Sequence, residues 1–307
     1  MRTTPARFDE LSALRRSTPG PERESGREAS GEPGLLRARR GRGRPGVVHL
    51  DLNGKTALVT GSSQGIGLAI ARGLASCGAQ VVLTGRTAAT LAEAAASIPG
   101  GAATWVAGDV TTDAGHAALV EQVPAVDVLV NNLGVFGAAD ALEISDDEWR
   151  RYFETNVLTA VRLTRQYLPG MVDRGWGRVQ YIASDSAVAV PVEMIHYGVS
   201  KTALLGVHRG FAKVAAGTGV TVNSVLAGPT RTGGVEDFVR QLVPGDLPWE
   251  QAEQEFMRLH RPQSLLQRLI EPEEIANLVC YLASPLASAT TGAAVRVDGG
   301  YVDSILP

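Results

Sequence analysis

Hydrophobic residues beyond residue 50 fall into short runs rich in Val, Ile and Leu, which alternate with longer segments of helical periodicity. Near-continuous apolar runs of this length are typical of parallel strands that are buried on both faces. The alternation predicts βαβ units on one parallel sheet, which is an α/β fold. The seven predicted strands are 55–60, 80–84, 103–108, 126–131, 178–184, 219–226 and 293–298, and the predicted helices are 66–77, 88–97, 146–168, 197–216 and 272–283.

The alternation is interrupted between residues 231 and 265, where Gly, Pro and scattered apolar residues replace it. A long irregular segment late in an α/β chain predicts a lid that covers a substrate. Trp249, Phe256 and Met257 lie in this segment, and we expect them to pack in helices or to belong to the lid.

The first 46 residues differ in composition from the rest, since they contain eleven Arg, six acidic residues and few apolar residues. Such a segment cannot bury enough apolar surface to offset the entropy of ordering it. A basic arm and a transit peptide are the alternatives, but acidic residues are interspersed and no apolar segment follows the start. We predict a disordered tail over 1–48, or an extension from an upstream start site, followed by one domain over 49–307.

Composition and charge narrow the class of partner. The chain has 307 residues, 44% of them hydrophobic and 20% charged, and a net charge of −3. It offers no basic field for nucleic acid and no polybasic membrane anchor, and no apolar stretch reaches the roughly 18 to 20 residues of a membrane span. Cys77 and Cys280 lie in predicted helices without Cys or His at ligand spacing, so we expect buried free thiols and neither a disulfide nor a metal site. These features predict a soluble cytoplasmic protein with a small-molecule ligand.

The first predicted strand runs directly into TGSSQGIG at 60–67, and a predicted helix follows. Glycines at 61, 65 and 67 would let the backbone turn sharply, approach a pyrophosphate closely and pack the helix against the strand. The first N–H groups of the helix would then face the phosphates. In this strand–loop–helix context the loop predicts a dinucleotide site, and a tight turn without a ligand is the alternative.

The second predicted strand ends in LTGRT at 83–87, where dinucleotide sites select between NAD and NADP. An acidic residue at this point binds the ribose hydroxyls of NAD, whereas an arginine pairs with the 2′-phosphate of NADP. Gly85 supplies no acid and Arg86 supplies a guanidinium, so we predict NADP(H), with NAD as the alternative. A solvated surface arginine is the other interpretation, because the chain has 26 Arg against three Lys.

Tyr197 and Lys201 are four residues apart in HYGVSK at 196–201, so they share one face of a predicted helix. Tyrosine is a poor acid–base group near neutral pH because its ordinary pKa is about 10. A nearby ammonium favours the phenolate and lowers that pKa, so the pair could move a proton, although such pairs are often only structural. His196 points about 100° away from Tyr197, and we expect it to face a lid or a substrate rather than to transfer a proton.

Further motifs follow in order: GDV at 108–110, NNLG at 131–134, Asn156 in ETNVL, Ser184, NSVLAGPTRT at 223–232 and VDGG at 297–300. With them the chain resembles the classical short-chain dehydrogenase/reductase family from about residue 50 to residue 305, and within it the branch of 3-oxoacyl-thioester reductases. The resemblance implies one Rossmann-type, doubly wound domain with a seven-stranded parallel sheet, assembled as a homodimer or homotetramer.

The resemblance also implies an active site made of Asn156, Ser184, Tyr197 and Lys201. Ser184 lies thirteen residues before Tyr197, the spacing common in the family, whereas Ser186 lies eleven before it. Tyr197 would exchange the proton and Ser184 would hold the substrate oxygen. Lys201 would assist Tyr197 and bind the nicotinamide ribose, while Asn156 would anchor a water that links Lys201 to solvent.

The implied reaction is hydride transfer between NADP(H) and a carbonyl compound or secondary alcohol. An NAD-linked alcohol dehydrogenase and a dinucleotide-binding regulator without turnover are the alternatives, but a regulator has no use for Tyr197, Lys201 and Ser184 together. Two residues depart from the family, Leu133 where Ala is common and Ala227 where Pro is usual. The implied cofactor contacts are Gly61, Ser63, Gln64, Gly65, Ile66, Gly67, Arg86, Asp109, Val110, Asn131, Gly134, Gly228 and Thr230.

Overall fold

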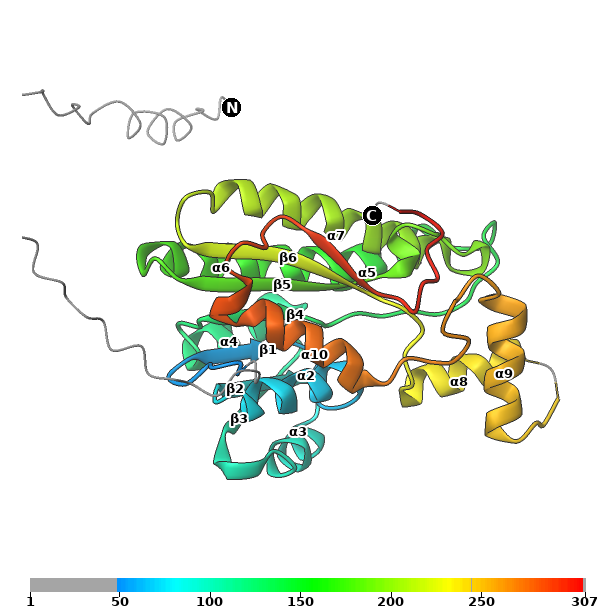
Figure 1. Ribbon diagram of the computed structural model, residues 1–307, viewed down its shortest axis with the longest axis horizontal. Helices are drawn as coiled ribbons and strands as arrows, with labels where there is room; N and C mark the ends of the chain where they lie inside the picture. The colour runs from blue at the N-terminus through cyan, green and yellow to red at the C-terminus, as the bar shows by residue number, and fades with distance from the viewer. Residues whose placement is uncertain (1–48, 244, 306–307) are drawn as a thin grey trace, which may run out of the picture. The chain divides into compact units, whose positions relative to one another are not determined.

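The computed structural model describes residues 49–243 and 245–305, and the prediction of a disordered tail over 1–48 concerns residues outside these ranges. Seven parallel strands form one sheet in the order β3-β2-β1-β4-β5-β6-β7 (Figure 1), which confirms the predicted fold class and strands. The strands are β1 (Thr56–Val59), β2 (Gln80–Gly85), β3 (Ala103–Ala107), β4 (Val128–Asn131), β5 (Gly177–Ser184), β6 (Val220–Ala227) and β7 (Ala294–Val297).

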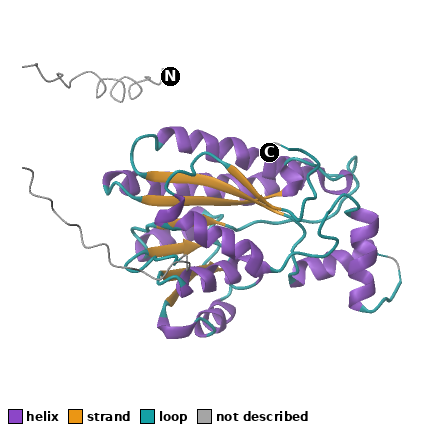
Figure 2. Ribbon diagram, in the orientation of Figure 1, coloured by secondary structure: helices purple, strands orange, loops and turns teal. Residues whose placement is uncertain are grey.

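Helices cover both faces of this sheet (Figure 2). They are α2 (Gly65–Ser76), α3 (Ala88–Ala96), α4 (Asp113–Gln122), α5 (Asp146–Phe153), α6 (Thr159–Asp173), α7 (Ile195–Val214), α8 (Gly233–Leu242), α9 (Trp249–His260) and α10 (Pro272–Ala283). Side chains alternate along each strand, so Val59 packs with α2, α3 and α10, whereas Leu58 packs with α4, α6 and α7. Cys77 and Cys280 are free thiols; Cys280 is buried in the first of these two cores, as expected, whereas Cys77 is only partly buried against it.

The predicted helix 146–168 differs from the structure in its middle and at its end. A π-helical turn, Glu154–Leu158, separates α5 from α6, and such turns are frequent at functional sites. The helix also continues through Pro169 as far as Asp173. Proline cannot donate a helix hydrogen bond, but Met171 is fully buried in the core beyond it, so packing holds the last turn in place.

The apolar pattern does not predict α4, because glycine interrupts it and Leu119 is its one fully buried side chain. Local contacts start this helix instead: Thr112 accepts a hydrogen bond from the Gly115 N–H at 3.1 Å. A Cβ at Gly115 would collide with the backbone carbonyl of Asp109, so glycine is required where the helix begins.

The irregular segment 231–265 contains α8 and α9, which pack on each other around a small core that includes Phe238, Phe256 and Met257. Phe256 and Met257 therefore pack in helices, which is one of the two roles expected for them. The chain leaves β6 and enters α8 within a few residues, so this pair of helices lies at the carboxyl end of the sheet (Figure 1). Among the residues that the structure describes, no helix is both long and apolar enough to cross a membrane.

Candidate active site

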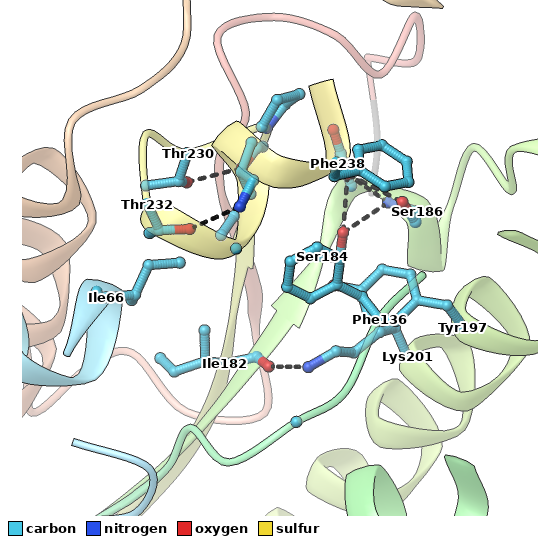
Figure 3. Close-up of a pocket in the computed structure, with 18 of the residues that line it drawn as sticks. Ile66, Phe136, Ile182, Ser184, Ser186, Tyr197, Lys201, Thr230, Thr232 and Phe238 are labelled. Carbon is cyan, nitrogen blue, oxygen red and sulfur yellow. Dashed lines mark hydrogen bonds between the residues drawn. The ribbon is translucent and has the colours of Figure 1, made fainter. Parts of the chain in front are cut away.

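A cavity of about 310 Å³ lies at the carboxyl ends of β1, β4, β5 and β6 (Figure 3). The chain extends the sheet from β1 through β2 to β3 and then returns to place β4 on the other side of β1. Open parallel sheets bind ligands where the strand order reverses in this way. The cavity therefore occupies the place at which the fold favours a ligand.

The loop between β1 and α2 has the backbone geometry of an anion site. Gly61 and Gly65 have φ angles of +61° and +56°, which side chains rarely allow. A Cβ at Gly67 would lie 2.6 Å from Nδ2 of Asn132, so only glycine lets α2 approach β1 this closely. No side chain caps the start of α2 at Gln64, and its first N–H groups remain available to a phosphate. These features fit the pyrophosphate of a dinucleotide.

Most of the residues that the sequence implies as cofactor contacts lie in the wall of this cavity, and five of them do not. Arg86 is exposed at the end of β2, and its positive charge acts with hydrogen bonds from Thr111 to lower the pKa of Asp109. Thr111 makes the larger contribution, and the Arg86 charge the smaller. Ser63 lies near Gly85, so these residues continue the surface beyond the cavity toward β3. The contacts that line the cavity are Gly61, Gln64, Gly65, Ile66, Gly67, Gly134, Gly228 and Thr230.

The other two implied contacts have structural environments. Val110 is buried in the sheet core on the α4 side. Asn131 is also buried, and its Nδ2 donates to Oγ1 of Thr164 on α6 at 3.4 Å. The neighbouring Asn132 lines the cavity instead, and its Nδ2 donates to the carbonyls of Thr60 (2.9 Å) and Gly61 (3.0 Å). The NNLG motif indicated an asparagine beside the cofactor site, but it did not show which of the two asparagines would hold the glycine-rich loop.

Three of the four implied catalytic residues meet in the cavity (Figure 3). Ser184 ends β5, while Tyr197 and Lys201 lie one turn apart on α7. The Lys201 side chain is buried, and its Nζ donates to the carbonyl of Ile182 at 2.8 Å and lies 5.6 Å from the centroid of the Tyr197 ring. The sheet and α7 thus bring a hydroxyl, a phenol and an amine together from distant parts of the chain.

Asn156 lies beside this group rather than in the cavity wall. It is buried in the π-helical turn, where its Oδ1 accepts from the Val135 N–H (2.8 Å) and its Nδ2 donates to Oγ of Ser200 (2.9 Å). A Cβ at Gly134 would lie 3.3 Å from both Oδ1 of Asn156 and Nζ of Lys201. Asn156 therefore ties the loop after β4 to α7 next to the amine.

The electrostatics of Tyr197 differ from the sequence prediction. Burial raises the pKa of Tyr197, and a hydrogen bond with Ser184 only partly offsets that rise. Burial also lowers the pKa of Lys201 to about 8, and its amine is turned toward the Ile182 carbonyl. The net shift of the Tyr197 pKa is therefore upward, opposite to the lowering expected from the sequence, because burial makes the largest contribution. A phenol with a raised pKa is protonated at neutral pH, which suits a proton donor.

Ser184 and its neighbour form a hydrogen-bonded pair. Its Oγ donates to Oδ1 of Asp185 (2.8 Å) and accepts from the Ser186 N–H (3.1 Å). Asp185 is buried, and this burial raises the pKa of its carboxyl group. The sequence did not single out Asp185, although its position directly after Ser184 was visible.

Several cavity residues were not predicted, or were predicted with other roles. Phe136 meets the Tyr197 ring edge-on at a centroid distance of 6.3 Å, and Arg261 also lines the wall. His196 does not face a lid or a substrate: it packs against the Tyr152 ring at a centroid distance of 4.0 Å, and burial lowers its pKa. Leu133 and Ala227 are the two residues that depart from the family pattern. Leu133 packs beside Gly61, and Ala227 lines the cavity.

Comparison with known proteins gives consistent matches over the same part of the chain. The family model described as enoyl-(acyl carrier protein) reductase matches residues 61–302. An uncharacterized oxidoreductase of Bacillus subtilis, YvaG, is 48% identical over 263 residues, which are 84% of this chain and 100% of that protein. A 3-oxoacyl-[acyl-carrier-protein] reductase of Aquifex aeolicus is 32% identical over 260 residues, or 82% of this chain and 99% of that protein.

A solved structure is similar over the same range. L-Sorbose reductase from Gluconobacter frateurii, complexed with NADPH and L-sorbose, matches with a TM-score of 0.79 and 35% identity, over 84% of this chain and 100% of that one. The fold, the motifs and these matches agree. The chain therefore belongs to the short-chain dehydrogenase/reductase family of oxidoreductases, with 3-oxoacyl reductases among its relatives.

Proposed function

We propose that the protein catalyses hydride transfer between NADP(H) and a carbonyl compound or the corresponding secondary alcohol. The observation that carries this proposal is the meeting of Ser184, Tyr197 and Lys201 in one cavity beside the glycine-rich loop. The NADPH in the matched L-sorbose reductase supports the choice of cofactor. A regulator that only binds a dinucleotide would not need a phenol, an amine and a hydroxyl at this point.

The chain's own residues handle the proton and the geometry. The nicotinamide cofactor supplies the hydride, and the glycine-rich loop with the start of α2 would hold its phosphates. Ser184 orients the substrate oxygen, while Tyr197 donates its phenolic proton to that oxygen during reduction. Lys201 stabilises the phenolate that remains. Asn156 holds the loop after β4 beside the Lys201 amine and, as the family resemblance implies, positions a water that returns the proton.

A direct assay tests this proposal. The full chain is purified and incubated with NADPH and a panel of ketones, 3-oxoacyl thioesters and aldehydes, and in the reverse direction with NADP⁺ and secondary alcohols. We expect carbonyl-dependent loss of NADPH absorbance with at least one class of substrate. Tight NADPH binding without oxidation across the whole panel would instead support the regulator.

Replacing Arg86 with Ala tests the cofactor preference. Because a guanidinium paired with the 2′-phosphate is lost, we expect the KM for NADPH to rise by about tenfold or more, while the KM for NADH changes by less than about twofold. Arg150→Ala, which removes an exposed arginine of α5 paired with acids of its own helix, is the control and should change neither value. Equal effects of Arg86→Ala on both cofactors would favour the NAD-linked alternative.

The lowered pKa of Lys201 predicts a pH dependence. Below about pH 8 the amine carries the charge that stabilises the Tyr197 phenolate, and above it that charge is lost. We therefore expect kcat/KM for carbonyl reduction to fall as the pH rises through about 8, because this parameter reports groups of the free enzyme. This decrease at alkaline pH should be absent from the pH profile of Lys201→Met, whose residual activity is low at every pH. If the decrease persists in this variant, another group is responsible for it.

A further inference from the structure

Arg261 forms part of the cavity wall directly after α9, and its position is fixed by its surroundings. The residue is only 6% exposed. Its Nη1 donates to the carbonyl of His260 (2.6 Å) and to Oε1 of Glu193 (3.3 Å). The guanidinium also lies over the rings of Phe256 (5.4 Å) and Tyr301 (5.5 Å). An arginine held by these contacts keeps one orientation, so it can select a ligand by geometry.

The remaining guanidinium nitrogens are free to bind a ligand. Within the described residues, Nε and Nη2 of Arg261 donate no hydrogen bond. Neither nitrogen is among the fully buried polar atoms that lack a partner, so both keep some exposure, and Arg261 lines the cavity. Two N–H groups on one rigid, planar edge suit a ligand with two neighbouring acceptor oxygens.

The charges around Arg261 favour an uncharged ligand. Glu193 already pairs with the guanidinium, and the Asp185 carboxyl lies near enough for the Arg261 charge to act on its pKa. Asp185 and Arg261 both line the cavity, and together with Glu193 the Asp185 side chain places two carboxyl groups near the Arg261 guanidinium. A substrate carboxylate bound at this guanidinium would lie close to two carboxyl groups, whereas hydroxyl groups can accept from Arg261 and donate to nearby acceptors.

An apolar ketone would leave the Arg261 N–H groups covered but unpaired. The loss of water from an unsatisfied charged donor is costly, and sites built to bind a hydroxyl reject analogues that lack it. The aromatic residues Phe136, Phe238 and Phe256 supply the apolar contact for the carbon chain. The wall thus combines a fixed donor edge with aromatic surface, which matches a polyhydroxylated carbon skeleton.

We propose that Arg261 recognises the substrate, and that the substrate is a hydroxylated ketone or its polyol, with hydroxyls next to the reacting carbon bound by Nε and Nη2. This inference rests on the proposed function. In reduction, a hydride adds to the carbonyl carbon, the C=O π electrons move to oxygen, and Tyr197 supplies the proton, so that a ketose becomes a polyol. NADPH is oxidised to NADP⁺ in the same step.

Three ketones with four carbons test the proposal without interference from ring closure. Erythrulose carries hydroxyls beside the carbonyl, 2-butanone carries none, and 3-oxobutanoate carries a carboxylate. We expect Arg261→Gln to lower kcat/KM for erythrulose by about 30-fold, mainly through KM, and to change the value for 2-butanone by less than about threefold. Arg258→Gln, which removes an exposed arginine of the neighbouring α9, should change neither.

Other results would overturn the proposal. An equal loss of kcat/KM for erythrulose and 2-butanone in Arg261→Gln would give Arg261 a structural role only, and a wild-type preference for 3-oxobutanoate would make the site one for anions. If Arg261→Gln does not fold, as judged by its melting curve, Arg261→Lys keeps the charge but loses the planar edge, and it should show the same selective loss. Turnover of 2-butanone without a preference for erythrulose would end this inference alone. Absence of turnover with every carbonyl would end the proposed function itself.

Discussion

Replacing Tyr197 with Phe is expected to lower kcat for carbonyl reduction by about 1,000-fold, while the Kd for NADPH stays within about twofold. The substitution removes one hydroxyl and keeps the ring that packs against Phe136. The raised pKa keeps the phenol protonated, and its hydroxyl is hydrogen-bonded with Ser184 in the cavity. Stopped-flow turnover and fluorescence titration with NADPH measure the two quantities separately.

The matched control is Tyr281→Phe, which removes a hydroxyl from a tyrosine of α10 that is 40% exposed. It should leave kcat and NADPH affinity unchanged. Retained turnover in Tyr197→Phe would assign proton transfer to another group, with Ser184 as the first candidate. A parallel loss of NADPH binding would instead mean that the phenol holds the cofactor.

Gly67→Ala is expected to weaken NADPH binding by at least about tenfold and to lower the free energy of unfolding by about 2 kcal/mol. The new methyl group would lie 2.6 Å from Nδ2 of Asn132 and 2.9 Å from Cα of Ser62. Neither neighbour can move freely, because Asn132 is bonded to the carbonyls of Thr60 and Gly61. The loop must therefore open, and the N–H groups that face the phosphates lose their alignment.

Gly206→Ala makes the same change in a helix where it meets no obstacle. Gly206 is exposed on α7, and a Cβ at this position would meet no atom within 4 Å outside its own helical turn. Alanine has the better helix propensity, so this variant should gain about 0.5 to 1 kcal/mol in stability and bind NADPH normally. Urea denaturation and fluorescence titration compare the pair. A Gly67→Ala protein as stable as the wild type, with normal binding, would show that the loop tolerates a side chain.

The sheet could be predicted from the sequence because strands buried on both faces leave continuous apolar runs. The start of α10 was equally legible, since Pro272 follows Glu271, whose backbone N–H is bonded by the Glu274 carboxylate. The π-helical turn at 154–158 left no such pattern, because one extra residue per turn changes hydrogen bonding without changing composition. The helices α8 and α9 pack mainly on each other, so their apolar residues did not follow the alternation of strands and helices seen in the rest of the chain.

The candidate site also contains some residues that could be predicted from the sequence and others that could not. Tyr197 and Lys201 are local in sequence, and a spacing of four residues was enough to pair them. Asp185 and Arg261 come together only in the folded chain, from the end of β5 and the end of α9, so no spacing could link them. The direction of the Tyr197 pKa shift also needed the structure, because the degree of burial decided it.

The strand order has a consequence for how the chain folds. β1 lies inside the sheet but is the first of the described strands to be synthesised, and its Thr56 N–H donates to Asp127, which lies 71 residues later. Pairings across so long a stretch form slowly, since a large loop must close before any contact is gained. On the ribosome, β1 has an unpaired edge until β4 has emerged. The reversal of strand order that creates the cavity thus also delays burial of β1 during synthesis.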